Sequence, residues 1–220
     1  MVDFAQARRM MVDSQLRTFD VNDVPLLNAM GEVPRERFVL PGRESLAYID
    51  RDLPVSLHPE RRSMLAPMVL ARMIQALEIE PGMRVLDVAA GLGYSSAVLA
   101  RLGATVTALE SDETLASAAR ERLASVGADG VTVVVGPLQD GHAESAPYDA
   151  ILVNGAVDVM PEALLRQLTP SGRLVCVHGR GRSAKATLHV RAGRAGGSRN
   201  LFDAAAPVLS DFEAERGFVF

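Results

Sequence analysis

The chain has 220 residues, of which 48% are hydrophobic and 23% are charged, so it can bury the core of a large α/β domain. The net charge of −4 gives no overall attraction to nucleic acid, and the single cysteine excludes an intramolecular disulfide. The first residues contain no apolar run long enough for a signal peptide or a membrane span. These features predict a cytoplasmic protein that binds neither a membrane nor nucleic acid.

The first 78 residues are mostly helical in pattern and are expected to form an N-terminal extension. Helices are predicted over residues 3–18, 24–30 and 67–77, with an extended connection over 33–39. Residues 79–220 alternate short apolar segments with helical ones. This alternation predicts a doubly wound, mostly parallel sheet that forms one compact unit with the extension.

The most informative segment covers residues 85–100 and predicts a buried strand, a glycine turn and a helix. Gly91 and Gly93 lack a Cβ, so they permit positive φ angles and the close approach of a ligand to the backbone. The first N–H groups of the following helix can meet a polar ligand. This geometry holds a nucleotide-like cofactor at the carboxyl end of the strand.

The residues around the turn indicate which cofactor it holds. Ser96 stands three positions after Gly93, where a dinucleotide fingerprint has a glycine, so no pyrophosphate loop is evident. Asp87 precedes the turn, where a carboxylate repels phosphate and attracts an ammonium group. Glu110 lies 19 positions after Gly91 (110 − 91), where a carboxylate can accept both hydroxyls of a ribose. These features favour S-adenosylmethionine over NAD, and a nucleotide-binding oxidoreductase is the alternative.

The remaining elements follow in chain order. Strands are predicted over residues 104–109, 131–135, 148–153 and 173–177, and helices over 111–126 and 161–168. Residues 179–200 are rich in glycine and arginine and predict a hairpin or a mobile loop. Eight basic residues and no acidic ones lie between residues 163 and 202. We interpret this run of basic residues as a solvated hairpin. The alternative is that it attracts an acidic substrate or RNA.

Short motifs recur in a fixed order over about residues 8 to 178. In the N-terminal part they are Met11-Val12, Gln15-Leu16, Asp23-Val24, Ala29-Met30, Val33-Pro34-Arg35-Glu36, Phe38-Val39, Tyr48, Asp50 and Leu53-Pro54-Val55. Further on they are Pro81-Gly82, Arg84-Val85-Leu86, Gly91-Leu92-Gly93-Tyr94, Pro147-Tyr148-Asp149, Pro161-Glu162-Ala163-Leu164 and Gln167-Leu168. The ordered series resembles the protein-L-isoaspartate O-methyltransferase family.

This resemblance implies a Rossmann-like class I methyltransferase that uses S-adenosylmethionine to esterify the free carboxylate of isoaspartyl residues in damaged proteins. Its partner is then a protein or peptide with a free carboxylate. That carboxylate is already ionised at pH 7, so no strong general base is needed. The predicted cofactor-binding residues are Asp87, Ala89, Gly91, Gly93, Glu110, Ser111, Leu138 and Asn154. No metal site is expected, because the four histidines are scattered.

The segment before Pro67 departs from the family pattern. Related enzymes usually carry Gly-Gln-Thr-Ile-Ser there, followed by one residue and Pro, and this chain has Arg-Arg-Ser-Met-Leu over residues 61–65. The active-site serine position is therefore Leu65, and Ser63 retains a hydroxyl at the threonine position. We predict Ser63 as the catalytic hydroxyl and Arg61 and Arg62 as substrate-binding residues. The alternative is a degenerate relative that binds the donor without isoaspartyl activity or methylates another acceptor.

Two further departures concern the donor site. Ala89 stands where the family has the first motif glycine. Pro137 stands where an acidic residue is expected near the adenine amino group, and Gln139-Asp140-Gly141 follows it. Gln139-Asp140-Gly141 can supply the missing acid if the turn is shifted.

Overall fold

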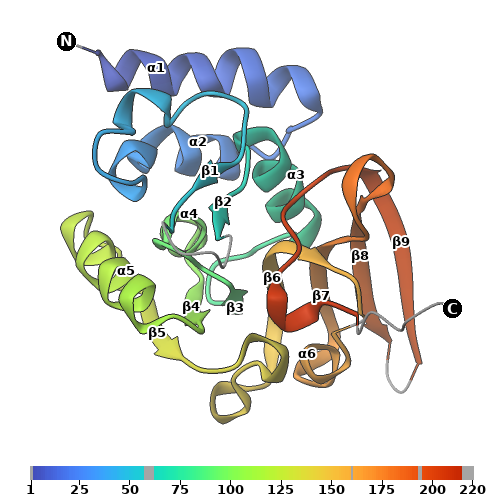
Figure 1. Cartoon of the computed structure of the whole chain (residues 1–220). Helices are drawn as coiled ribbons and strands as arrows, with labels where there is room; N and C mark the ends of the chain where they lie inside the picture. Colours follow the sequence, from blue (N-terminus) through green and yellow to red (C-terminus); the bar gives the residue numbers. More distant parts are fainter. Residues whose placement is uncertain (1, 57–61, 160, 193–194, 215–220) are drawn as a thin grey trace, which may run out of the picture.

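A computed structural model describes residues 2–56, 62–159, 161–192 and 195–214, and its described part contains one large sheet of seven strands (Figure 1). The strands, in sheet order, are β5 (Val131–Val135), β4 (Thr105–Glu110), β3 (Arg84–Val88), β6 (Tyr148–Val157), β7 (Leu168–His178), β8 (Lys185–Ala192) and β9 (Ala195–Asp203). Strands β5 to β7 in this order pair in parallel, whereas β8 and β9 are antiparallel. The predicted doubly wound, mostly parallel sheet is therefore confirmed.

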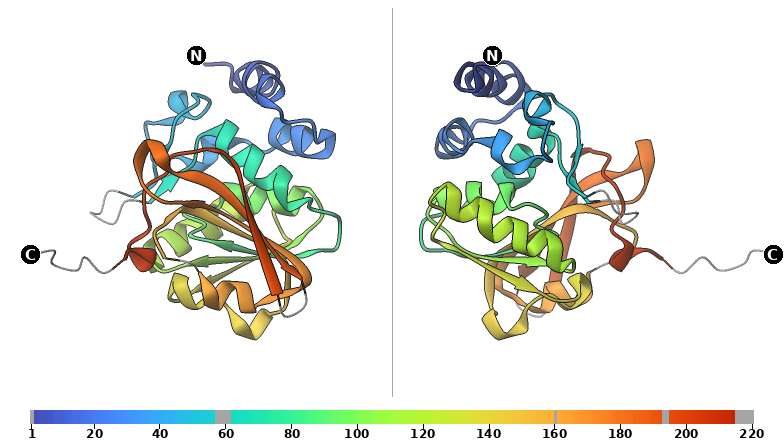
Figure 2. Two further views of the ribbon diagram at one scale, coloured as in Figure 1. Left: turned by 90° about the vertical axis from the view of Figure 1, so that its right-hand side faces the viewer. Right: turned by 60° about the vertical axis from the view of Figure 1, so that its left-hand side comes forward.

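Both faces of the central strands β3, β4, β6 and β7 are buried, because their side chains alternate between two apolar clusters. Val85 and Ala150 belong to the cluster that also contains residues of α3 (Pro67–Leu77), α4 (Tyr94–Arg101) and α5 (Glu113–Ser125). Their neighbours Leu86 and Ile151 belong to the opposite cluster, which includes Leu164 of α6 (Glu162–Arg166). Figure 2 shows α6 on the face of the sheet opposite to α3 and α4. Burial on both faces explains why these strands read as continuous apolar runs.

The N-terminal extension packs on the first of these faces. It contains α1 (Phe4–Met11) and α2 (Val24–Glu32), which begin at the capping side chains of Asp3 and Asp23. Met11 and Met30 are fully buried in the same cluster as the strand residue Val85. One continuous core therefore joins the extension to the sheet.

Some predicted elements differ from the observed ones in their bounds. The helix expected over residues 3–18 is α-helical only to Met11 and continues as a π-helical segment (Val12–Leu16) and a 3₁₀ turn (Arg17–Phe19). The helix expected over 161–168 is shorter, because β7 already begins at Leu168.

The glycine- and arginine-rich segment forms the β8–β9 hairpin, one of the two predicted outcomes. Some of its basic side chains are neutralised within the chain, since Lys185 pairs with Asp203 and the preceding Arg180 pairs with Asp158. Among the described residues, no helix combines the length and apolar character required to cross a bilayer.

Candidate active site

Three polar residues meet at the carboxyl edge of the sheet, as expected for neighbouring parallel strands. Asp87 lies near the end of β3, Glu110 ends β4, and Asn154 lies in β6. The Asn154 amide donates hydrogen bonds to Asp87 Oδ1 (2.6 Å) and to the Val88 carbonyl (3.3 Å). The sequence-based grouping of these residues around the glycine turn thus matches their positions in the fold.

Asp87 is fully buried and ties β3 to the first turn of α4. Its Oδ2 accepts hydrogen bonds from the hydroxyls of Ser95 (2.7 Å) and Ser96 (2.5 Å). Burial raises the pKa of the Asp87 carboxyl from 3.8 to about 6, against the opposing effect of the hydrogen bonds from Ser96, Ser95 and Asn154. The carboxylate therefore holds the turn in place, and its contact with an ammonium group stays a prediction.

The turn itself has a left-handed backbone at Ala89 (φ 57°), Gly91 (φ 58°) and Gly93 (φ 92°). A Cβ on Gly91 would lie 3.1 Å from Val55 Cγ2, and one on Gly93 would lie 3.1 Å from Leu123 Cδ1. Both glycines are therefore favoured by their positive φ angles, and a Cβ at either position would also crowd a neighbouring side chain. Ala89 adopts the same strained region at the position where the family has a glycine.

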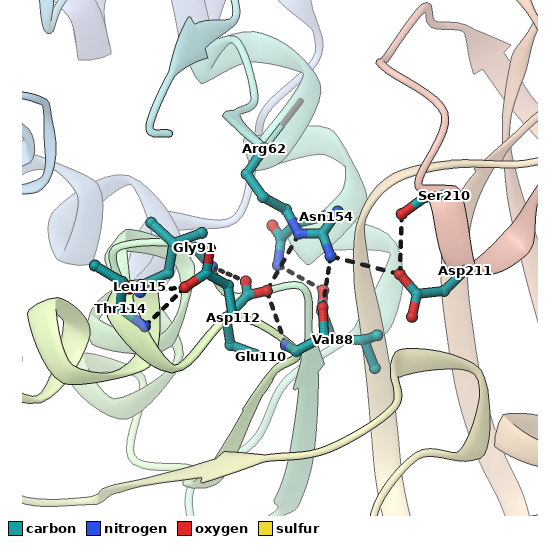
Figure 3. Close-up of polar contacts among 11 residues, drawn as sticks. Arg62, Val88, Gly91, Glu110, Asp112, Thr114, Leu115, Asn154, Ser210 and Asp211 are labelled. Atoms are coloured by element: carbon teal, nitrogen blue, oxygen red, sulfur yellow. Dashed lines mark hydrogen bonds and ion pairs between the residues drawn. The ribbon is translucent and has the colours of Figure 1, made fainter. Parts of the chain in front are cut away.

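Glu110 is almost completely buried, with 1% of its side chain exposed, and it faces the glycine turn (Figure 3). Its Oε2 accepts the Gly91 N–H at 2.9 Å, and its Oε1 accepts the Ser111 N–H at 2.9 Å. The Nε of Arg62 also donates to Oε1, at 3.2 Å. The carboxylate predicted to bind a ribose is therefore preorganised by backbone donors and paired with a guanidinium.

Arg62 lies on the donor side of the site. Its Nη2 donates to the Ser111 hydroxyl at 2.7 Å and reaches Asp211 Oδ2 at 3.5 Å. Its predicted role in binding a substrate carboxylate stays a prediction, and Arg61 lies outside the described residues. Leu138 is fully buried in the second core at the 3₁₀ turn after β5, and its contact with the cofactor likewise stays a prediction.

We call residues 63–66 the acceptor segment, because they contain the predicted catalytic serine and the position of the family serine. This segment begins as β2 (Ser63–Met64), which pairs with β1 (Leu53–Pro54) in antiparallel register. Ser63 and the buried Leu65 line one cavity together with Gly91 and Asn154. The structure therefore brings the predicted catalytic hydroxyl to the predicted cofactor turn.

Three residues that fix this segment were not predicted as site residues. Arg35 is fully buried and donates to the Leu65 carbonyl (Nη2, 2.6 Å) and to the Ala47 carbonyl (Nε, 2.7 Å). Asp52 accepts the Ala66 N–H at 2.8 Å, and Asp50 accepts the Met68 N–H at 3.2 Å. Arg35 and Asp50 belong to the N-terminal motifs, so those motifs were the available signal.

The arrangement fits S-adenosylmethionine. The buried Glu110 carboxylate beside the positive-φ glycines Gly91 and Gly93 suits a ribose, and the turn has no glycine spacing for a pyrophosphate. Glu110, the turn and Asn154 are the residues that would hold this cofactor. Among the described residues, no group of three His, Cys, Asp or Glu side chains is placed to hold a metal ion.

Comparisons with known proteins show the family to which the chain belongs. The family model described as Protein-L-isoaspartate(D-aspartate) O-methyltransferase matches residues 7–198. The protein-L-isoaspartate O-methyltransferase of Methylorubrum extorquens (strain PA1) is 47% identical over 176 residues, which are 79% of this chain and 74% of the relative. That of Roseiflexus castenholzii is 42% identical over 190 residues, 86% of this chain and 85% of the relative.

A solved structure named protein-L-isoaspartate O-methyltransferase has a TM-score of 0.81 and 24% identity, and the match covers 93% of this chain and 65% of that one. At this identity the likeness shows the fold. Fold, site and relatives together define a class I methyltransferase that uses S-adenosylmethionine. Since the family model matches most of its length, the chain belongs to the protein-L-isoaspartate O-methyltransferase family.

Proposed function

We propose that this methyltransferase esterifies the free carboxylate of isoaspartyl residues in proteins or peptides. The observation that carries the proposal is that Ser63 and Leu65 of the acceptor segment line the same small cavity as Gly91 and Asn154 of the donor site. The names of the relatives, which are protein-L-isoaspartate O-methyltransferases over most of this chain's length, support the same substrate class.

The reaction requires the protein mainly to align the acceptor carboxylate with the methyl group of the donor. S-adenosylmethionine, when bound, supplies an electrophilic methyl group, and the acceptor carboxylate is ionised at pH 7. The Ser63 hydroxyl would donate a hydrogen bond that orients this carboxylate. The apolar side chains of Phe38, Val55 and Leu65 line the cavity and would exclude water around the reacting groups.

A transfer assay with a labelled methyl donor tests the proposal. We expect transfer to an isoaspartyl peptide and none to its aspartyl counterpart. Ser63→Ala should lower kcat/KM by roughly ten- to a hundred-fold through the loss of one hydrogen bond to a charged group. Its affinity for S-adenosylhomocysteine should stay near that of the wild type. Ser14→Ala, at an exposed serine of the extension, is the matched control and should change neither quantity.

Variants at position 65 provide a second test of the proposal. Leu65→Ser introduces the hydroxyl usual in the family and should raise isoaspartyl activity, whereas Leu65→Ala removes the same bulk without adding a hydroxyl. The backbone bond from Arg35 to the Leu65 carbonyl is retained in both variants. If neither the wild type nor Leu65→Ser transfers methyl groups to isoaspartyl peptide, the proposal is wrong. The leucine at position 65 would then support the alternative, in which the chain binds the donor and methylates another acceptor.

A further inference from the structure

Arg62 is paired with Glu110, the carboxylate predicted to bind the ribose of the donor. Only 4% of the Arg62 side chain and 1% of the Glu110 side chain are exposed, so the guanidinium covers the carboxylate (Figure 3). The Nε–Oε1 distance of 3.2 Å makes this a hydrogen-bonded ion pair in the interior of the donor site. While this pair persists, Arg62 competes with a ribose for the Glu110 carboxylate.

The acceptor capacity of the carboxylate leads to the same conclusion. An ionised carboxylate has about four lone-pair positions. Among the described residues, the donors on Glu110 are the Gly91 N–H, the Ser111 N–H and Arg62 Nε, which leave about one position. The two hydroxyls of a ribose need two. The N–H groups belong to the backbone of the turn and the strand end, so Arg62 is the donor that bond rotation can remove.

The structure also offers Arg62 a second partner. Its backbone is held, because the Val55 N–H donates to the Arg62 carbonyl at 3.0 Å. Its Nη2 already lies 3.5 Å from Asp211 Oδ2, and the Asp211 side chain, at 17% exposure, is more accessible than Glu110. A change of side-chain rotamer can therefore release Glu110 while an ion pair with Asp211 is kept. Phe212, next to Asp211, is buried in the second core and anchors this partner.

We propose that Arg62 is exchanged during donor binding: it pairs with Glu110 in the free enzyme and with Asp211 once the ribose occupies Glu110. Arg62 therefore competes with the donor for Glu110. The strength of the Arg62–Glu110 pair sets the affinity of the enzyme for the donor. The inference rests on the donor site and is independent of the acceptor. Failure of isoaspartyl transfer would leave it intact.

Calorimetric titration with S-adenosylhomocysteine and thermal unfolding test the exchange. Arg62→Gln, which introduces the residue usual in the family, should lower the Tm of the free enzyme because buried Glu110 loses its counterion. The same variant should bind S-adenosylhomocysteine roughly ten-fold more tightly, since no charged hydrogen bond has to be broken first. Asp211→Asn removes the second partner and should weaken binding. Arg51→Gln, at an exposed arginine, is the control and should bind like the wild type.

Unchanged or weaker binding by folded Arg62→Gln would overturn the proposal, because Arg62 would then be a bystander or a ligand of the donor. A crystal structure of the wild type with S-adenosylhomocysteine gives a test that needs no variant. We expect the ribose hydroxyls on Glu110 and the Arg62 guanidinium beside Asp211. Persistence of the Arg62 Nε–Glu110 Oε1 contact next to a bound ribose would refute the exchange.

Discussion

The buried carboxyl of Asp87 should make the stability of the enzyme depend on pH, and Asp87→Asn isolates this effect. Burial raises the pKa of Asp87 from 3.8 to about 6, so the folded chain holds this proton more tightly than the unfolded chain. A raised folded-state pKa contributes stability that is complete below the unfolded value. That stability is lost as the pH rises through the folded value.

The size of the effect follows from the two pKa values. With 3.8 in the unfolded chain and about 6 in the folded one, the free energy of unfolding should fall by about 1.4 kcal/mol between about pH 5 and pH 7.5. Asparagine does not titrate, so the variant lacks this component. Its single side-chain oxygen also satisfies the donors of Ser95, Ser96 and Asn154 poorly, which should lower its stability at every pH.

Urea unfolding followed by circular dichroism at several pH values measures the prediction. The stability advantage of the wild type over Asp87→Asn should be larger near pH 5 than near pH 7.5, by about 1.4 kcal/mol. Asp129→Asn, at an exposed aspartate, should retain the pH dependence of the wild type. An advantage of equal size at both pH values would show that the pKa of Asp87 is not raised in the folded enzyme.

Further predictions concern the turn and the acceptor segment. Gly91→Val should abolish calorimetric binding of S-adenosylhomocysteine while helix content stays near wild type, because its Cβ would crowd Val55 at a left-handed φ. Retained binding would place the cofactor elsewhere. Arg35→Met should lower the free energy of unfolding in urea by roughly 2–5 kcal/mol, since the carbonyls of Ala47 and Leu65 lose buried donors; a neutral effect would contradict this. Ala89→Gly should raise the Tm, with up to about 1 kcal/mol gained from relief of backbone strain, and a lower Tm would show that its methyl packing matters more.

The arrangement of Asp87, Asn154 and the glycine turn was largely predictable because its determinants are local. The strand, turn and helix over residues 85–100 each have a distinct pattern, and parallel strands end at one edge, which places Asp87 near Asn154. The pairing of Arg62 with Glu110 was not predictable. It joins residues 48 positions apart and depends on which way a side chain points beside a two-residue strand. The change from α- to π-helix after Met11 likewise depends on tertiary packing, because the apolar periodicity continues through it.

The active site draws its two halves from separate stretches of the chain, and this division bears on how new specificities arise. Strands β3, β4 and β6 carry the donor half, whereas the acceptor half is fixed by Arg35 and Asp52 of the extension. Substitutions of Ser63, Met64 or Leu65 therefore change the environment of the acceptor, whereas a change at Arg62 also alters the contact with Glu110 of the donor half. The serine-to-leucine difference at Leu65 is one such substitution. A change confined to this short segment therefore alters the acceptor side of the site and leaves strands β3, β4 and β6 as they are.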